Sequence, residues 1–256
     1  MLPAIPGPGQ WGGNSLHTLP LKERAMTVLD DIPFELDPDA LLRRVHVAAD
    51  SEDAAAFGDM LRRAVARARP KALYRECYID AKGERTVTIG GVTFTSAVLR
   101  ANLDQAERVF AYLATCGREV DETDVPDGDL LAQFWLDTIK GALLGIAVSH
   151  LASHLETRHA LGKTATMAPG SGDITVWPIE QQRELFSLLG DTRELIGVEL
   201  TDSFLMVPNK SLSGIRFPTE VDFRSCQLCR RENCPSRSAE FDPQLWQSVR
   251  DDGHVA

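Results

Sequence analysis

Apolar residues recur at helical spacing in three long stretches of the chain. The first follows Asp37 and Pro38. Such a pair is typical of a helix start, because the carboxylate can cap the first turn and proline there loses no hydrogen bond. The second follows Ser51, which can cap its helix in the same way, and the third covers about residues 127–159. The pattern therefore predicts three amphipathic helices, of which the third is the longest.

Shorter apolar runs separated by turn residues predict strands. Lys82-Gly83 and Gly90-Gly91 divide three of these runs in the manner of a meander. We expect strands at Ala72–Ile79, Thr86–Ile89, Val92–Phe94 and Val109–Cys116, and a strand pair or one bent strand at Ile196–Leu200 and Ser203–Val207. We expect short helices at Ser96–Asn102, Asp104–Arg108, Glu180–Leu189 and Pro243–Arg250.

The organisation suggested by these elements is a tail followed by one domain. Residues 1–21 are rich in proline and glycine and lack a hydrophobic period, which predicts a disordered or loosely draped tail. Residues 22–256 form the predicted domain: a helical and meander part to about residue 125, then the long helix and the part that carries the candidate ligand and cysteine sites.

Composition excludes several classes of function. The net charge of -10 argues against nucleic acid as a partner, because phosphate binding requires clustered Lys and Arg. We find no apolar run near the ~20 residues of a membrane span and no secretory signal at the N-terminus. We therefore expect a cytoplasmic protein.

Three of the five cysteines, Cys226, Cys229 and Cys234, lie within nine residues. This spacing lets one loop turn three sulfur atoms toward a single point, as metal centres require. Cys116 is the best candidate for a fourth ligand, because Gly117 lets the backbone bend sharply at a strand end and expose the thiol; Cys77 is the second.

The identity of what these cysteines hold has three alternatives. An iron–sulfur cluster and a structural zinc ion both use such cysteine sets. Unligated or redox-active thiols are the third, because a C-x-x-C pair can also exchange disulfides. Nearby arginines, among them Arg224 and Arg237, would offset the negative charge of a thiolate-rich centre.

One stretch carries a family resemblance. Leu200–Gly214 reads LTDSFLMVPNKSLSG and resembles the signature LTESFAMxPxxSVSG of the activation (reactivation) domain of cobalamin-dependent methionine synthase. The helix end with His154 and Arg158 is similar to that family's His-x-x-x-Arg helix, and MAPGS falls at its S-adenosylmethionine loop. The similarity covers about residues 30–237. It includes the short, stand-alone relatives of this domain.

The resemblance implies a fold and a function. The implied fold is α+β, a twisted antiparallel sheet with helices packed around it. The implied function is to bind S-adenosylmethionine, to dock on a corrinoid protein and to assist the reduction and remethylation of its cobalamin, in methionine biosynthesis, with a flavodoxin- or ferredoxin-type electron donor. By position, Ala168, Pro169, Gly170 and Ser171 would contact the ligand, and Lys210 would neutralise a carboxylate or phosphate.

Two departures from the family pattern change the expectation. The family's arginine falls at Thr166 and its tyrosine at Ser171. Loss of the guanidinium removes a carboxylate contact worth roughly 1.5–3 kcal/mol. The cysteine cluster is the second departure. We therefore predict a stand-alone reactivation protein whose iron–sulfur centre, held by Cys116 and the C-terminal cysteines, passes an electron to cobalamin; the alternative is a non-catalytic, zinc-stapled docking module for a corrinoid protein.

Overall fold

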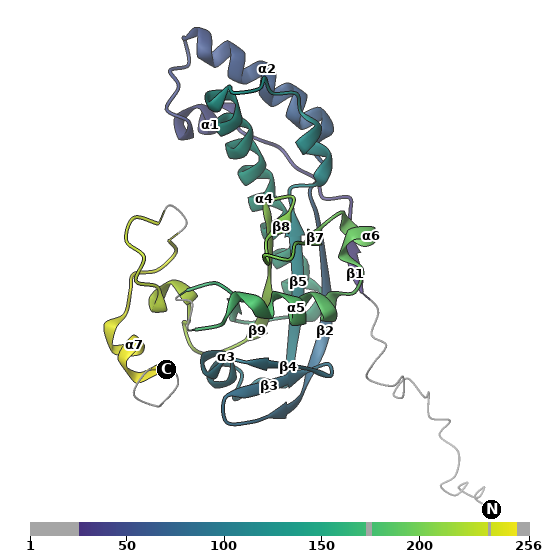
Figure 1. The fold of residues 1–256 in the computed structure, drawn as a ribbon, viewed down its shortest axis with the longest axis vertical. Helices are drawn as coiled ribbons and strands as arrows, with labels where there is room; N and C mark the ends of the chain where they lie inside the picture. Colours follow the sequence, from purple (N-terminus) through teal and green to yellow (C-terminus); the bar gives the residue numbers. More distant parts are fainter. Residues whose placement is uncertain (1–25, 173–175, 235–236, 250–256) are drawn as a thin grey trace, which may run out of the picture.

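The computed structural model describes residues 26–172, 176–234 and 237–249 (Figure 1). The predicted tail at residues 1–21 lies outside the described residues. The described part is built around one seven-stranded sheet, in which strands run in the order β4-β3-β2-β5-β9-β6, with β1 paired to β2. Its strands are β1 (Thr27–Leu29), β2 (Lys71–Lys82), β3 (Thr86–Ile89), β4 (Val92–Thr95), β5 (Arg108–Thr115), β6 (Thr164–Met167) and β9 (Ser211–Pro218).

All neighbouring strands in this sheet are antiparallel. A separate antiparallel pair is formed by β7 (Glu199–Leu200) and β8 (Met206–Val207). Because β9 pairs with β5 and β6 pairs with β9, strands from both sides of residue 125 share one sheet. The fold class is therefore α+β, as predicted.

The helices cover both faces of the sheet and extend beyond it. They are α1 (Pro38–Arg44), α2 (Glu52–Arg67), α3 (Ala97–Asn102), α4 (Leu130–His159), α5 (Gln182–Leu189), α6 (Thr192–Ile196) and α7 (Pro243–Val249), with 3-10 turns η1 (Arg118–Glu122), η2 (Ile179–Gln181) and η3 (Ser225–Leu228). The first half of α4 packs with α1 and α2 in a helical arm beyond one end of the sheet (Figure 1). We call this part the arm.

The predicted helix starts are confirmed by their caps. The Asp37 carboxylate accepts hydrogen bonds from the backbone N–H groups of Asp39 and Ala40. The Ser51 hydroxyl accepts from Ala54, and the Asp129 carboxylate from Ala132. Each cap pairs an N–H group that the first helical turn leaves without a partner.

Three apolar clusters hold these layers together. One sheet face, with Val109, Leu113 and Ile215, packs under α5, α6 and the C-terminal segment. The opposite face, with Phe110 and Tyr112, packs against the second half of α4. The first half of α4 fills the core of the arm. Helix α4 is long and apolar enough to cross a membrane by length and composition, but it is also the element that joins arm and sheet.

The sequence missed or misassigned several segments, among them β1 and the helix α6, whose last residue Ile196 was expected to begin a strand. Strand β9 was not predicted, because its hydroxyl residues Ser211 and Ser213 hide the alternation; both are buried and hydrogen-bonded. Strand β6 was not predicted either. The predicted helix Asp104–Arg108 is wrong: Ala106 closes a turn onto the carbonyl of Leu103 and the chain then enters β5. A segment this short has no apolar stripe to bury, so the sheet determines its conformation.

Candidate functional site

A cleft of about 310 Å³ lies along the edge strand β6. It brings together two segments that are distant in sequence, the loop that follows β6 and the start of the cysteine segment. Its walls are Tyr112, Thr164–Ala168, Ser171, Leu212, Arg216, Asp222–Cys226 and Ser238. The size lies at the lower end of the range for small-molecule sites, and the walls carry charged and hydroxyl groups.

Arg216 is the charged group on the sheet wall of this cleft. It stands directly opposite Thr166 in the β6–β9 pair, so both side chains lie on the same sheet face. Its guanidinium donates to the Thr164 hydroxyl at 2.9 Å and lies 3.6 Å from the Glu156 carboxylate of α4. The side chain is only 16% exposed, which orients the guanidinium. Sequence reasoning missed Arg216, since only the strand register reveals that it faces Thr166.

Tyr112 lies beside Arg216, and the bare backbone of Gly214 makes room for it. Burial raises the pKa of the Tyr112 phenol, while Arg216 and a hydrogen bond with Thr166 act in the opposite direction. A Cβ atom at Gly214 would lie 2.8 Å from the Met167 carbonyl oxygen and 2.9 Å from the Tyr112 hydroxyl. Contacts this short are not tolerated, so glycine is required where the phenol crosses β9.

Two hydrogen bonds fix the loop after β6 on the side away from the cleft. Gly170 donates its N–H to the Trp177 carbonyl at 2.8 Å and has a φ of +78°, which favours glycine. The Pro169 carbonyl accepts from the buried Gln182 amide at 3.4 Å. Of the four predicted ligand contacts, Ala168 and Ser171 line the cleft. Pro169 and Gly170 are not among its walls; they fix the loop.

Lys210 lies elsewhere. Its ammonium forms an ion pair with the Asp137 carboxylate of α4 at 2.8 Å, and it does not line the cleft. The structure therefore does not bring Lys210 together with the loop after β6.

The C-terminal cysteines lie on one arginine-braced segment. Cys226 lines the cleft, and its sulfur accepts hydrogen bonds from the Ser238 N–H at 3.5 Å and hydroxyl at 3.4 Å. Burial acts to raise the pKa of Cys226, but the Ser238 hydrogen bonds outweigh it and the pKa lies below its ordinary value. The Arg237 guanidinium donates to the carbonyls of Cys226 at 3.5 Å and Cys229 at 3.3 Å. Cys229 and Cys234 are half-buried.

Cys116 is separated from these three residues. It is fully buried in the core of the arm, where burial raises its pKa to about 12. Gly117 does allow a sharp bend, with a φ of +91°, but a Cβ there would lie 2.2 Å from the Arg69 carbonyl oxygen. The close approach packs the thiol under α2 and does not expose it.

Cys77 does not replace Cys116 as a fourth ligand, because it is buried in the sheet core and its pKa is raised to about 11. Within residues 26–172, 176–234 and 237–249, no group of three or more His, Cys, Asp or Glu side chains is arranged to hold a metal ion. A four-cysteine centre that includes Cys116 therefore does not fit this structure.

No family model matches the chain, and no curated protein matches it. Among solved structures, the chain is similar to "Crystal Structure of the MetH Reactivation Domain bound to AdoHcy". The TM-score is 0.49 and the sequence identity 14%, over 90% of this chain and 86% of that chain.

Proposed function

We propose that this chain is a stand-alone reactivation protein for a cobalamin-dependent methyltransferase of the methionine synthase type, and that the cleft beside β6 binds S-adenosylmethionine or its product. The observation that carries the proposal is the convergence of three features on one cleft. These are the loop with Ala168 and Ser171, the Arg216 guanidinium, and the close approach at Gly214, which ends the signature-like stretch.

Arg216 takes over the role of the arginine that the family carries at the position of Thr166. A guanidinium recognises a carboxylate through two parallel hydrogen bonds. The Arg216 guanidinium lies 3.6 Å from the Glu156 carboxylate, and the Glu156 side chain is about half exposed. The carboxylate of an amino-acid ligand would replace Glu156 on this guanidinium.

The other walls suit the rest of such a ligand. Asp222, which also lines the cleft, offers a negative charge to an ammonium or sulfonium group. The backbone of Ala168 and the hydroxyl of Ser171 offer hydrogen-bonding groups at the mouth. A zwitterionic ligand therefore finds a partner for each of its charges.

The proposal includes partners. A protein with this role docks on a corrinoid protein in the cytoplasm, and a flavodoxin- or ferredoxin-type protein supplies the electron that cobalamin receives. An iron–sulfur or zinc centre in this chain would depend on Cys226, Cys229 and Cys234 with a fourth ligand other than Cys116. Such a centre would supply one-electron transfer if it holds iron, and a structural staple if it holds zinc.

Calorimetric titration with S-adenosylmethionine and S-adenosylhomocysteine tests the ligand. We expect Arg216→Ala to weaken binding by roughly 10- to 100-fold, the loss of one charged hydrogen-bonding partner. Arg62→Ala is the matched control, because Arg62 also forms an ion pair, with Asp59, but on the arm. Wild-type protein that binds neither compound, or Arg216→Ala that binds as wild type does, contradicts the proposed site.

Metal analysis after anaerobic purification separates the two roles of the cysteine segment. Iron with sulfide in wild type, lost in Cys229→Ser, supports electron transfer by this chain. Zinc without iron supports the zinc-stapled docking module, and absence of both metals removes the metal centre from either account.

A further inference from the structure

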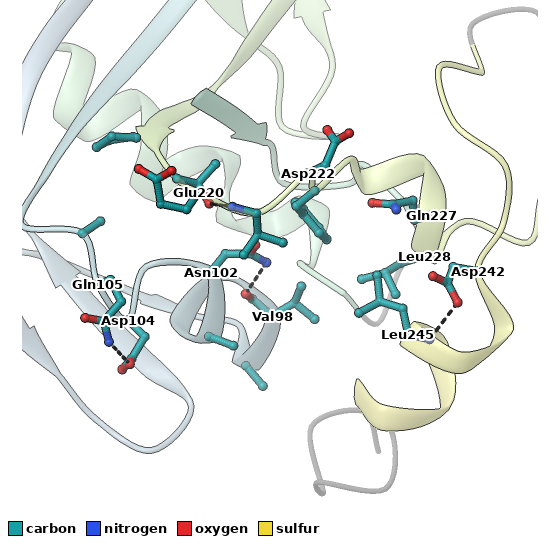
Figure 2. A pocket seen from close by; sticks show the side chains of 17 residues that line it. Val98, Asn102, Asp104, Gln105, Glu220, Asp222, Gln227, Leu228, Asp242 and Leu245 are labelled. Carbon is teal, nitrogen blue, oxygen red and sulfur yellow. Dashed lines mark hydrogen bonds between the residues drawn. The ribbon is translucent and has the colours of Figure 1, made fainter. Parts of the chain in front are cut away.

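A second and larger cavity, of about 560 Å³, lies between α3 and the C-terminal segment. Figure 2 shows Val98 and Asn102 on α3 facing Leu228 and Leu245 across it. The chain from Pro218 to Leu228 forms the wall toward the cleft beside β6, and Asp222 and Phe223 line both spaces. The cavity itself is separate from the proposed S-adenosyl site.

The floor of this cavity is apolar. The side chains that form it are Ala97, Val98, Ala101, Ala106, Pro218, Val221, Phe223, Leu228 and Leu245. Several of them are otherwise part of the sheet core, and Leu228 is fully buried. Covering an apolar surface of this kind with a ligand is favourable, because it removes the surface from water.

The rim is acidic. Asp104, Glu220, Asp222 and Asp242 line the cavity, and none of the described residues that line it is a lysine or arginine. Two of these carboxylates have other roles: Asp104 binds Arg100 at 2.8 Å, and Asp242 accepts from the N–H groups that begin α7. Glu220 extends from the wall (Figure 2). Within the described part of the chain its carboxylate has no hydrogen-bond partner, and its backbone carbonyl accepts from the Lys163 ammonium at 3.4 Å.

We propose that this cavity binds a small organic cation with an apolar body, such as an aryl-alkyl ammonium. The apolar floor takes the body, and the Glu220 carboxylate attracts the charge, with Asp104 and Asp242 adding to the negative potential of the rim. The same carboxylates repel an anion of equal size, so charge sets the selectivity and the floor supplies the affinity. The amide oxygens of Asn102 and Gln105 add hydrogen-bond acceptors around the rim.

Three naphthalene compounds of nearly equal shape test this assignment on the full chain. They are naphthylmethylammonium, naphthylmethanol and naphthoate, and saturation-transfer NMR with titration measures their affinities. We expect the ammonium to bind at least about tenfold more tightly than naphthoate, with the alcohol between them. Equal affinities, the reverse order, or no binding by the ammonium would overturn the proposal.

Two variants locate the binding. Ala101 is exposed on α3 and lines the cavity, so Ala101→Trp fills the space and should reduce ammonium binding at least about tenfold. Glu220→Lys should weaken the ammonium about fivefold or more and strengthen naphthoate. Its matched control is Glu122→Lys, at an exposed site on η1 of the arm, which should change neither. Binding that survives Glu220→Lys unchanged overturns the site even if Ala101→Trp does not fold.

Discussion

We expect an added methyl group at Gly214 to disrupt the packing of the proposed site. Strand β9 is central in the sheet, and Gly214 pairs with Tyr112 of β5. In Gly214→Ala the new Cβ would meet the Met167 carbonyl oxygen at 2.8 Å, the Tyr112 hydroxyl at 2.9 Å and its Cζ at 3.0 Å. Neither neighbour yields easily, because one is strand backbone and the other is a buried ring.

The expected cost follows from overpacking. Forcing a methyl group into a packed interior costs about 1–3 kcal/mol, and a backbone contact places this variant in the upper half of that range. We expect Gly214→Ala to lose about 2–3 kcal/mol of unfolding free energy. For a chain of this size, 1 kcal/mol corresponds to about 2–4 °C, so the melting temperature should fall by roughly 4–12 °C.

Calorimetric melting of two glycine variants measures this effect. Gly145→Ala is the matched control: Gly145 is exposed on α4, and a Cβ there meets nothing within 4 Å. That change should stabilise the protein by about 0.5–1 kcal/mol, since alanine restricts the unfolded chain and favours helix. The close approach of β9 to Tyr112 is refuted if Gly214→Ala has the melting temperature of the wild-type protein, or if the melting temperatures of both variants change equally.

Two further predictions concern titrating groups. The His154 and His159 rings both lie 3.3 Å from the Tyr74 hydroxyl, and burial lowers the pKa of each below its ordinary value of 6.5. The unfolded chain then binds more protons below about pH 6.5, so stability is present above that pH and is lost as pH falls through the lowered values. Between pH 7.5 and 5.5, the urea midpoint of the double variant His154→Gln/His159→Gln should fall less than that of the wild-type protein. An equal fall in the two proteins contradicts this prediction. Iodoacetamide at pH 7 should modify Cys226 long before Cys116, whose pKa burial raises to about 12; mass mapping that finds Cys116 modified first in the folded protein counts against the separation.

The sequence predicts well those elements whose stability is local. The helices that begin after Asp37, Ser51 and Asp129 carry their own caps and apolar faces, so their existence follows from spacing. The meander strands β3 and β4 are similarly delimited by their glycines. These parts need no knowledge of distant contacts.

The elements that the sequence missed depend on partners far along the chain. Ser211 and Ser213 are buried in β9 because Thr115 and Gln182, 96 and 31 residues away, accept hydrogen bonds from their hydroxyls. Edge strand β6 exists only because β9 is present to pair with it. Polar residues of this kind are typical of loops in a sequence, and only the assembled sheet shows that they lie in strands.

The candidate site shows the same division. The loop at Ala168 and Ser171 and the thiol of Cys226 were identified from the sequence, and the structure places them on one cleft. Arg216 was missed because strand register decides which side chains face each other. Cys116 was assigned to the cysteine cluster on the flexibility of Gly117, but the same bend buries the thiol in the arm.

The most direct test of the central claim is an NMR titration of isotopically labelled protein with S-adenosylhomocysteine. The account predicts saturable shifts of the backbone amides of Ala168 and Ser171 and of the Arg216 guanidinium, with Lys210 unaffected. Shifts that do not saturate, or that cluster away from the cleft beside β6, would contradict it.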